Sequence, residues 1–286
     1  MKENYEKAFN IGIVGLGLIG GSFARSFSKF TPHRVFGRGR ALGGAAASAA
    51  VSAGAVSGEL TDEKLSELDV LIFAVNPRTT VEIFGAYLPL LKSGCVVLDA
   101  GGVKRGVVAA MEQAAKEHPA LQFVGAHPMA GREISGFSAS TAELFMGASC
   151  LLVPVNADSG AVDGIKKLLF SVGFKNCKVT SAAEHDKMIA FTSQLCHAIS
   201  ASYCLNPLSS AHDGYSAGSF RDLTRVARLS APMWTELFCD NADELSAVLS
   251  SFIGQIDVLR QAIERRDEDE VYKILSAANC QRLTFG

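Results

Sequence analysis

The glycine-rich stretch "GLGLIGG" near the N-terminus constrains the fold of this chain more strongly than any other feature of its sequence. It follows the apolar run "IGIV" and precedes "SFARSFSKF", which has helical spacing. Gly15, Gly17 and Gly20 form a G-x-G-x-x-G pattern between a predicted strand and a predicted helix. In that context the pattern is typical of the first unit of a Rossmann-type dinucleotide-binding domain.

Each glycine has its own physical role in such a loop. Gly15 allows the tight turn, Gly17 lets a pyrophosphate approach the backbone, and Gly20 lets the helix pack closely on the strand. The free backbone N–H groups at the start of the helix, at Leu18 and Ile19, then bind the pyrophosphate. The alternative is a glycine-rich turn that binds no ligand, but strand, spacing and helix together favour a dinucleotide site.

Residues 1–181 alternate short apolar runs with helix-like stretches, which is the pattern of a parallel sheet with crossover helices. The apolar runs are continuous rather than alternating, which indicates strands covered on both faces. The sequence therefore predicts an α/β, Rossmann-type dinucleotide-binding domain over residues 1–181. The predicted strands are residues 11–15, 34–37, 69–75, 95–100, 122–126, 149–155 and 177–181.

The strand signals stop after this domain. Residues 182–205, 220–229, 231–266 and 267–283 all have helical spacing, and residues 206–219 form the main predicted loop. The sequence thus predicts an all-α second domain over residues 182–286. Its stretch "LSAVLSSFIGQIDVL" carries more apolar surface than one small helical domain can hide, which predicts a homodimer.

Composition limits the class of protein. The net charge of −2 gives no general attraction to nucleic acid or to an anionic membrane. No apolar run reaches the roughly 18 residues of a membrane helix, and the polar start "MKENYEKAFN" lacks the core of a signal peptide. Seven scattered cysteines without a C-x-x-C pair indicate free thiols, no structural metal site and a cytoplasmic location.

A candidate catalytic residue lies in "GAHPMAGRE". His127 directly follows the predicted strand 122–126, so we expect it at the carboxyl edge of the sheet, where open α/β sheets bind ligands. A lone histidine is more often a structural residue, so this position needs support from elsewhere in the chain.

Two helical stretches of the second domain offer that support. At about 100° per residue, Asp186, Ser193, His197 and Ser200 form a polar stripe that suits the wall of a cleft, whereas His185 falls off the stripe and is interpreted as structural. The same spacing places three arginines (Arg221, Arg225 and Arg228) on one helical face, where a guanidinium could bind a carboxylate. Either group could instead be a solvated surface.

Several of these motifs together resemble one family. "GLGLIGGS", "DAGGVK", "GAHPMAGRE", "EHD", "SQLCH", "LTRVA" and "MWTELF" occur in the order found in the prephenate/arogenate dehydrogenases of tyrosine biosynthesis, over nearly the full chain. The resemblance implies a Rossmann-type domain followed by a helical dimerisation domain. It also implies an oxidative decarboxylation of a small-molecule substrate, in which hydride leaves ring C4 for the nicotinamide, CO2 is lost and the ring aromatises without a metal.

The resemblance also implies residue roles. His127 matches the catalytic histidine that takes the C4 hydroxyl proton, and His197 matches a second active-site histidine. Arg225 matches the arginine that binds the ring carboxylate, and Glu133 and Trp234 match residues around the substrate. The chain departs from the family in having Gly102 where a serine usually lies beside the catalytic histidine, so other groups are expected to orient His127.

The same resemblance leaves several points open. It does not distinguish prephenate from arogenate, and we expect neither a regulatory domain after the helical domain nor a mutase domain before the first. A related two-domain β-hydroxy acid dehydrogenase or pyrroline reductase is the nearest alternative, with Lys187 as its catalytic lysine. A non-catalytic nucleotide-sensing protein is the second alternative.

The expected cofactor is NADP rather than NAD. An NAD site normally has an acid about 20 residues after the glycines, and no Asp or Glu occurs between Lys7 and Gly58. Arg38 and Arg40 flank Gly39 at the end of the second predicted strand, where two guanidinium groups could bind a 2′-phosphate. The alternative is that both arginines are solvated loop residues and that a backbone group binds the 2′-hydroxyl of NAD. The predicted cofactor-binding residues are Gly15, Gly17, Leu18, Ile19, Gly20, Arg38, Gly39, Arg40 and Val75, the last being the end of the strand predicted over residues 69–75.

Overall fold

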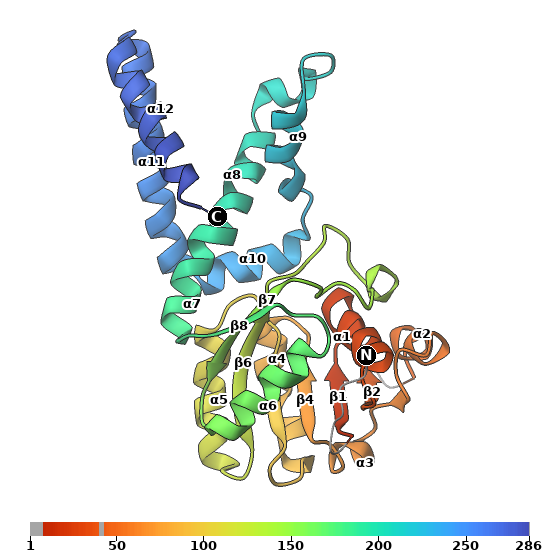
Figure 1. Cartoon of the computed structure of the whole chain (residues 1–286). Helices are drawn as coiled ribbons and strands as arrows, with labels where there is room; N and C mark the ends of the chain where they lie inside the picture. The colour runs from red at the N-terminus through yellow and green to blue at the C-terminus, as the bar shows by residue number, and fades with distance from the viewer. Residues whose placement is uncertain (1–7, 40–42, 286) are drawn as a thin grey trace.

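A computed structural model describes residues 8–39 and 43–285 of the chain. They form an N-terminal α/β part and a C-terminal set of helices (Figure 1). Among the described residues, no helix is long and apolar enough to span a membrane.

The α/β part is built on one eight-stranded sheet with the order β3-β2-β1-β4-β5-β6-β7-β8. The order reverses between β1 and β4, which is the switch point where doubly wound sheets bind their ligands. The strands are β1 (Asn10–Val14), β2 (Arg34–Arg38), β3 (Gly58–Glu59), β4 (Val70–Phe73), β5 (Val96–Asp99), β6 (Gln122–Pro128), β7 (Ser149–Pro154) and β8 (Asn176–Val179).

Helices cover both faces of this sheet, as the continuous apolar strands predict. One buried cluster includes Phe27 of α1 and Ile165 of α6, and a second includes Phe84 of α4 and Met111 of α5. The α/β part therefore has a core on each face of the sheet. Its helices are α1 (Leu18–Phe30), α2 (Ala45–Ser52), α3 (Asp62–Leu65), α4 (Pro77–Tyr87), α5 (Arg105–Glu117) and α6 (Ser159–Phe170), with 3₁₀ turns at Leu88–Leu90 and Phe137–Ala139.

The sheet differs from the prediction at two places. β7 runs antiparallel to β6, although the sequence pattern predicts parallel strands throughout. The two-residue β3, which pairs with β2, is too short to show an apolar run. Neither change moves the switch point.

The C-terminal half is helical, as predicted. Its elements are α7 (Ala182–Ile189), a π-helical turn (Ala190–Gln194), α8 (Leu195–Cys204), a 3₁₀ turn (Pro207–Ala211), α9 (Gly218–Thr224), a 3₁₀ turn (Arg225–Ala227), α10 (Ala231–Asp240), α11 (Ala242–Glu264) and α12 (Glu268–Leu283).

These helices form two arms that rise from the α/β part (Figure 1). α11 and α12 run side by side in one arm, and α8 and α9 form the other, with α10 crossing near their base. The sequence predicts one helix over residues 231–266, but the structure has two. The helix is interrupted at Asn241, which is buried between α10 and α11.

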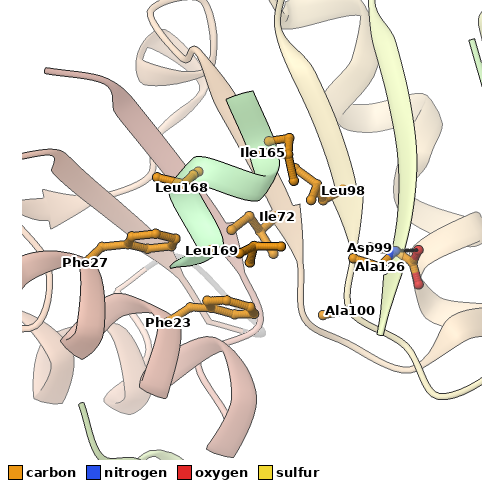
Figure 2. A pocket seen from close by; sticks show the side chains of 10 residues that line it. All are labelled: Phe23, Phe27, Ile72, Leu98, Asp99, Ala100, Ala126, Ile165, Leu168 and Leu169. Atoms are coloured by element: carbon orange, nitrogen blue, oxygen red, sulfur yellow. Dashed lines mark hydrogen bonds between the residues drawn. The ribbon is translucent and has the colours of Figure 1, made fainter. Parts of the chain in front are cut away.

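A small cavity lies inside the core of the α/β part (Figure 2). Its volume of about 10 Å³ is at the lower limit for one water molecule, and apart from Asp99 its lining is apolar. Asp99 lies at one end, where its Oδ1 accepts a hydrogen bond from the backbone N–H of Ala126 at 3.2 Å. This cavity is a packing void and is too small for a substrate.

Candidate active site

The glycine loop between β1 and α1 has the geometry of a dinucleotide site. Gly15 has φ +96°, and a Cβ there would lie 2.5 Å from the carbonyl oxygen of Ala74. A Cβ on Gly20 would lie 1.9 Å from the carbonyl oxygen of Gly15, so the helix packs on the loop only with glycine there. Gly17 has no atom within 4 Å of the equivalent position, which leaves its surface open to a ligand.

The start of α1 completes this loop. Gly17 is the N-cap of the 13-residue helix and, being a glycine, has no side chain with which to cap it. The backbone N–H groups of Leu18 and Ile19 are therefore available to an anion, and the helix dipole favours one there. Val75, which follows β4, lies against the loop, because a Cβ on Gly15 would be 2.6 Å from its side chain.

The end of β2 carries the second part of the predicted cofactor site. Arg38 is the last residue of β2, and its guanidinium lies 5.3 Å from the ring centroid of Tyr87. Its Nη1 donates a hydrogen bond to Asp62 Oδ1 at 2.9 Å, so an acid does lie beside this arginine. Gly39 follows β2 directly, and Arg40 lies outside the described residues.

His127 lies within a strand rather than after one. β6 extends to Pro128 because it pairs with antiparallel β7, where His127 is opposite Leu151 and Pro128 is opposite Cys150. The prediction that the strand ends at residue 126 is therefore wrong by two residues. A position on a paired strand holds the His127 backbone more firmly than a loop would.

His127 contacts His185, a residue that the sequence analysis interpreted as structural. The His127 Nδ1 and His185 Nε2 atoms are 2.9 Å apart, and His185 is only 1 % exposed. Its other ring nitrogen, Nδ1, lies 2.7 Å from Asp186 Oδ1. The sequence did not predict the contact between His185 and His127, because a helical wheel of α7 does not show what packs against that helix from β6.

Asp186 is anchored to the start of α5. Its Oδ1 accepts a hydrogen bond from the backbone N–H of Lys104 at 2.7 Å, and its Oδ2 accepts one from Arg105 at 2.9 Å. Burial raises the pKa of Asp186, but the hydrogen bonds from His185 and from these two N–H groups outweigh it, so the pKa lies below its usual value. Asp186 is therefore a carboxylate at neutral pH.

The histidine pair is neutral at the same pH. Burial lowers the pKa of His127 well below its ordinary value, and the charge of Lys104 and the His185 ring lower it further. Burial also lowers the pKa of His185, although the hydrogen bond to Asp186 acts in the opposite direction. A neutral imidazole keeps one nitrogen lone pair, so His127 is able to act as a base.

A buried ion pair lies beneath these groups. Lys104 Nζ lies 2.5 Å from Asp99 Oδ2 and donates a second hydrogen bond to the carbonyl oxygen of Gly101 at 2.8 Å. Both side chains are at most 1 % exposed. The pair fixes the turn between β5 and α5, whose backbone N–H groups hold Asp186.

A second cluster forms on the helical half around His197. Its ring stacks on Trp234 with centroids 3.7 Å apart, and its Nδ1 donates a hydrogen bond to the carbonyl oxygen of Ser193 at 2.9 Å. Burial lowers the pKa of His197, and the nearby Arg225 lowers it further. Arg225 forms an ion pair with Glu133, which belongs to the segment after β6.

Four of the five predicted catalytic and substrate-binding residues therefore lie together, and His127 lies in the first cluster. α10 connects the two clusters, because Trp234 and Leu237 are three residues apart on the same face of that helix. A Cβ on Gly102 would lie 3.3 Å from Leu237 and 4.0 Å from His127 Nε2. The face of α10 that carries Trp234 therefore also lies near His127, through Leu237.

Two predicted helical faces are not present. The π-helical turn at Ala190–Gln194 changes the residue spacing, so Asp186 and His197 do not belong to one stripe. Asp186 is buried against α5 instead of lining a cleft wall. The helix that begins with α9 ends at Thr224, and Arg225 and Arg228 follow in and after a 3₁₀ turn, so the three arginines share no helical face.

The arrangement can bind an anion and remove a proton. The N–H groups of the glycine loop can bind a pyrophosphate at the switch point of the sheet, and Arg225 offers a cation to an anionic substrate. His127 Nε2, which has no hydrogen-bond partner among the described residues, offers a lone pair at the carboxyl end of β6. Lys187, the lysine of the alternative dehydrogenase hypothesis, is exposed on α7 and has no ion pair among the described residues.

Comparisons with known proteins agree with this geometry. Residues 27–178 match the family model described as the nucleotide-binding domain of prephenate dehydrogenase, and residues 181–277 match its dimerisation domain. The chain is 30 % identical over 298 aligned positions to the cyclohexadienyl dehydrogenase of Zymomonas mobilis, covering 96 % of each protein. It is also 30 % identical to the prephenate dehydrogenase of Bacillus subtilis, covering 94 % of this chain and 74 % of that protein.

A solved structure gives the same result. The prephenate dehydrogenase of A. aeolicus, in complex with hydroxyphenyl propionate and NAD+, is similar with a TM-score of 0.85 and 27 % identity, covering 99 % of this chain and all of that one. The Rossmann-type domain with a following helical domain is therefore confirmed. The two family matches together span most of the sequence, and the chain belongs to the prephenate dehydrogenase family.

Proposed function

We propose that this chain catalyses the oxidative decarboxylation of prephenate or arogenate with NAD(P)+, and that His127 is the general base. The observation that carries the proposal is the neutral His127 imidazole, whose Nε2 is free at the carboxyl edge of the sheet. The relatives named prephenate and cyclohexadienyl dehydrogenase support the same reaction.

His127 would move one proton twice. It takes the proton of the C4 hydroxyl as the C4–H bond breaks, and the C4–O bond becomes a carbonyl. When CO2 leaves C1, the electron pair of the broken bond passes into the ring, and the new phenolate oxygen takes the proton back from His127. The products are CO2, the reduced cofactor and a phenol, so no net proton is released.

The other predicted site residues would bind and orient the substrate. Arg225 offers two-point contact to the ring carboxylate, and Glu133 holds that guanidinium in place. The stacked pair of His197 and Trp234 presents a flat surface to the substrate. The bound nicotinamide supplies the acceptor for the C4 hydride, and the residues of the glycine loop hold its pyrophosphate.

The test is an assay of the purified protein on prephenate and on arogenate, with His127→Asn as the diagnostic variant. We expect turnover of at least one substrate and a loss of roughly 10²-fold or more in kcat in the variant, with unchanged cofactor affinity. His118→Gln, at the end of α5, is the matched control and should keep kcat. Turnover of neither substrate, or near-normal kcat in His127→Asn, would contradict the proposal.

We further propose that NADP is the preferred cofactor. Arg38 is held against Tyr87 at the end of β2, and its partner Asp62 is 63 % exposed, so water screens the pair. A 2′-phosphate brings about two negative charges and competes well for such a guanidinium. A charge-assisted contact of about 1.5–3 kcal/mol would favour NADP by roughly ten-fold to a hundred-fold.

The ratio of kcat/KM for NADP+ to that for NAD+ tests this preference. We expect a ratio above one in the wild type, a fall of at least about ten-fold in Arg38→Ala/Arg40→Ala, and no fall in Asp62→Asn. A wild-type preference for NAD+, or a double variant that keeps full NADP selectivity, would contradict it.

The working unit that we propose is a homodimer of chains with domains over residues 1–181 and 182–286. The family model for the helical half is described as a dimerisation domain, which supports a self-associating helical half. All seven cysteines are free thiols, which fits the expected cytoplasmic location.

A further inference from the structure

Among the described residues, the His127 side chain has one hydrogen-bond partner, His185. Its Nδ1 lies 2.9 Å from His185 Nε2, with the two ring centroids 5.1 Å apart and the ring planes at 50°. His185 belongs to α7 of the helical half, whereas His127 belongs to β6 of the sheet. The helical half of the chain therefore contacts His127, the proposed base in the α/β part, through His185.

Asp186 determines which nitrogen of each ring carries a proton. A carboxylate only accepts hydrogen bonds, so His185 Nδ1, at 2.7 Å from Asp186 Oδ1, carries the hydrogen. His185 is neutral, so its Nε2 has a lone pair and accepts from His127 Nδ1–H. His127 is neutral too, and its lone pair is therefore on Nε2, the nitrogen that a substrate can reach.

Within the described part of the chain, no side chain hydrogen bonds to the other ring nitrogen, Nε2. Gly102 lies there, and a Cβ built on it would be 4.0 Å from His127 Nε2. A glycine has no hydroxyl with which to orient the ring. The other side chain near that Cβ is Leu237, at 3.3 Å, which is apolar and cannot orient the ring by a hydrogen bond.

We propose that His185, held by Asp186, is the positioning residue that fixes His127 in the Nδ1–H tautomer and aims Nε2 at the substrate hydroxyl. The proposal rests on the proposed role of His127 as base. In the other tautomer Nε2 would carry the hydrogen and could not accept a proton. His185 also contributes when His127 becomes charged, because its Nε2 lone pair faces the protonated Nδ1 of the imidazolium.

The tautomer can be read directly by ¹⁵N NMR of the full-length protein labelled at histidine, with the His127 signals identified in His127→Asn. We expect a protonated Nδ1 and an unprotonated Nε2 for His127 in the wild type. This readout needs no substrate, so it stays informative if the proposed reaction is wrong. A wild-type His127 that carries its proton on Nε2 would overturn the proposal.

Two substitutions at His185 test its effect on catalysis. His185→Leu removes the acceptor, and we expect a mixed His127 tautomer and a fall in kcat of about 10- to 100-fold, with KM for the cofactor within about two-fold. His185→Gln keeps an oxygen that accepts from His127 and an amide N–H that donates to Asp186. It should restore most of kcat and the single tautomer.

A purely structural role would give a different result. In that case His185→Gln and His185→Leu would change the melting temperature, but both variants would keep the wild-type His127 tautomer and the wild-type kcat. His118→Gln is the matched control and should leave both readouts at the wild-type values. If His185→Leu fails to fold, the wild-type tautomer together with kcat of His185→Gln decides: a Gln variant with the Nε2–H tautomer and full kcat would overturn the proposal.

Discussion

As the proposed base, His127 can accept a proton only while it is neutral, so its pKa would set the lower pH limit of activity. Burial, the charge of Lys104 and the His185 ring all lower this pKa, so the neutral form persists below the ordinary value of 6.5. We expect kcat/KM to stay level as the pH falls through 6.5 and to decline only below the lowered pKa. A pH profile of kcat/KM checks this, and a decline centred at or above 6.5 would contradict the assignment.

A substitution of Arg225 tests the proposed role of the second cluster, the one around His197, in substrate binding. Arg225→Ala should lower kcat/KM by about ten-fold to a hundred-fold, because a charge-assisted hydrogen bond contributes about 1.5–3 kcal/mol. The loss should appear mainly in KM, since the proposed contact with the substrate carboxylate would be made in the ground state as well. Arg221→Ala, an exposed arginine on α9, is the control, and equal effects of the two variants would mean that Arg225 belongs to the surface.

The site residues differ in how far the sequence could predict them. The glycine loop could be read from local spacing, because strand, turn and helix lie next to one another in the chain. The role of His185 depends on the packing of α7 against β6, which no local pattern contains. The one signal for it was the adjacent acid in "EHD", since a histidine followed by a buried aspartate has a partner for one ring nitrogen.

At the scale of elements, Glu236 of α10 ties the helical half to the sheet. Its Oε1 accepts a hydrogen bond from the backbone N–H of Arg78 at 3.0 Å, and its Oε2 accepts one from Asn76 Nδ2 at 3.1 Å. These contacts cap the start of α4, because the side chain of its N-cap residue, Asn76, accepts no hydrogen bond from the N–H groups of its own helix. Arg78 also forms an ion pair with Asp240, which like Glu236 belongs to α10.

We expect Glu236→Ala to lower the free energy of unfolding by about 1 kcal/mol, the usual effect of a lost helix cap. Denaturant unfolding followed by circular dichroism measures the change. Glu82→Ala, at an exposed position on α4 without an ion pair among the described residues, is the control. A Glu236→Ala variant as stable as that control would show that the cap is replaced by water.

The elements themselves were largely predictable, and the failures have physical causes. Periodicity located the major strands of the sheet and most helices because each of these buries an apolar face. It could not give the direction of β7, since an antiparallel strand buried on both faces has the same continuous apolar pattern as a parallel one. It also missed the break at Asn241, whose amide hydrogen bonds to Asp186 and Gln194 come from elements distant in sequence.

At the scale of the whole molecule, the two helical arms expose much apolar surface. Ile253, Ile256 and Val258 of α11 are 63 %, 49 % and 50 % exposed, in an arm that stands away from the sheet (Figure 1). A protein rarely leaves so many large apolar side chains of one helix in water, so we expect a second copy of the chain to cover them.

Light scattering at micromolar concentration should therefore give twice the mass of the chain. Ile253→Asp should shift the mass toward the monomer, because it places a charge in the apolar contact. Val51→Asp, at an exposed position on α2, is the control and should remain a dimer. A monomeric wild type would contradict the prediction.

The π-helical turn between α7 and α8 sets the rotation of His197 relative to His185 around the helix axis. A turn with i→i+5 hydrogen bonds holds about one residue more than an α-helical turn, so it amounts to a single-residue insertion between His185 and His197. Deleting Thr192, an exposed residue of that turn, would restore regular α-helix and rotate His197 by about 100° relative to His185. The two histidines could then no longer contact His127 and Trp234 at the same time, although every side chain that touches the substrate would still be present.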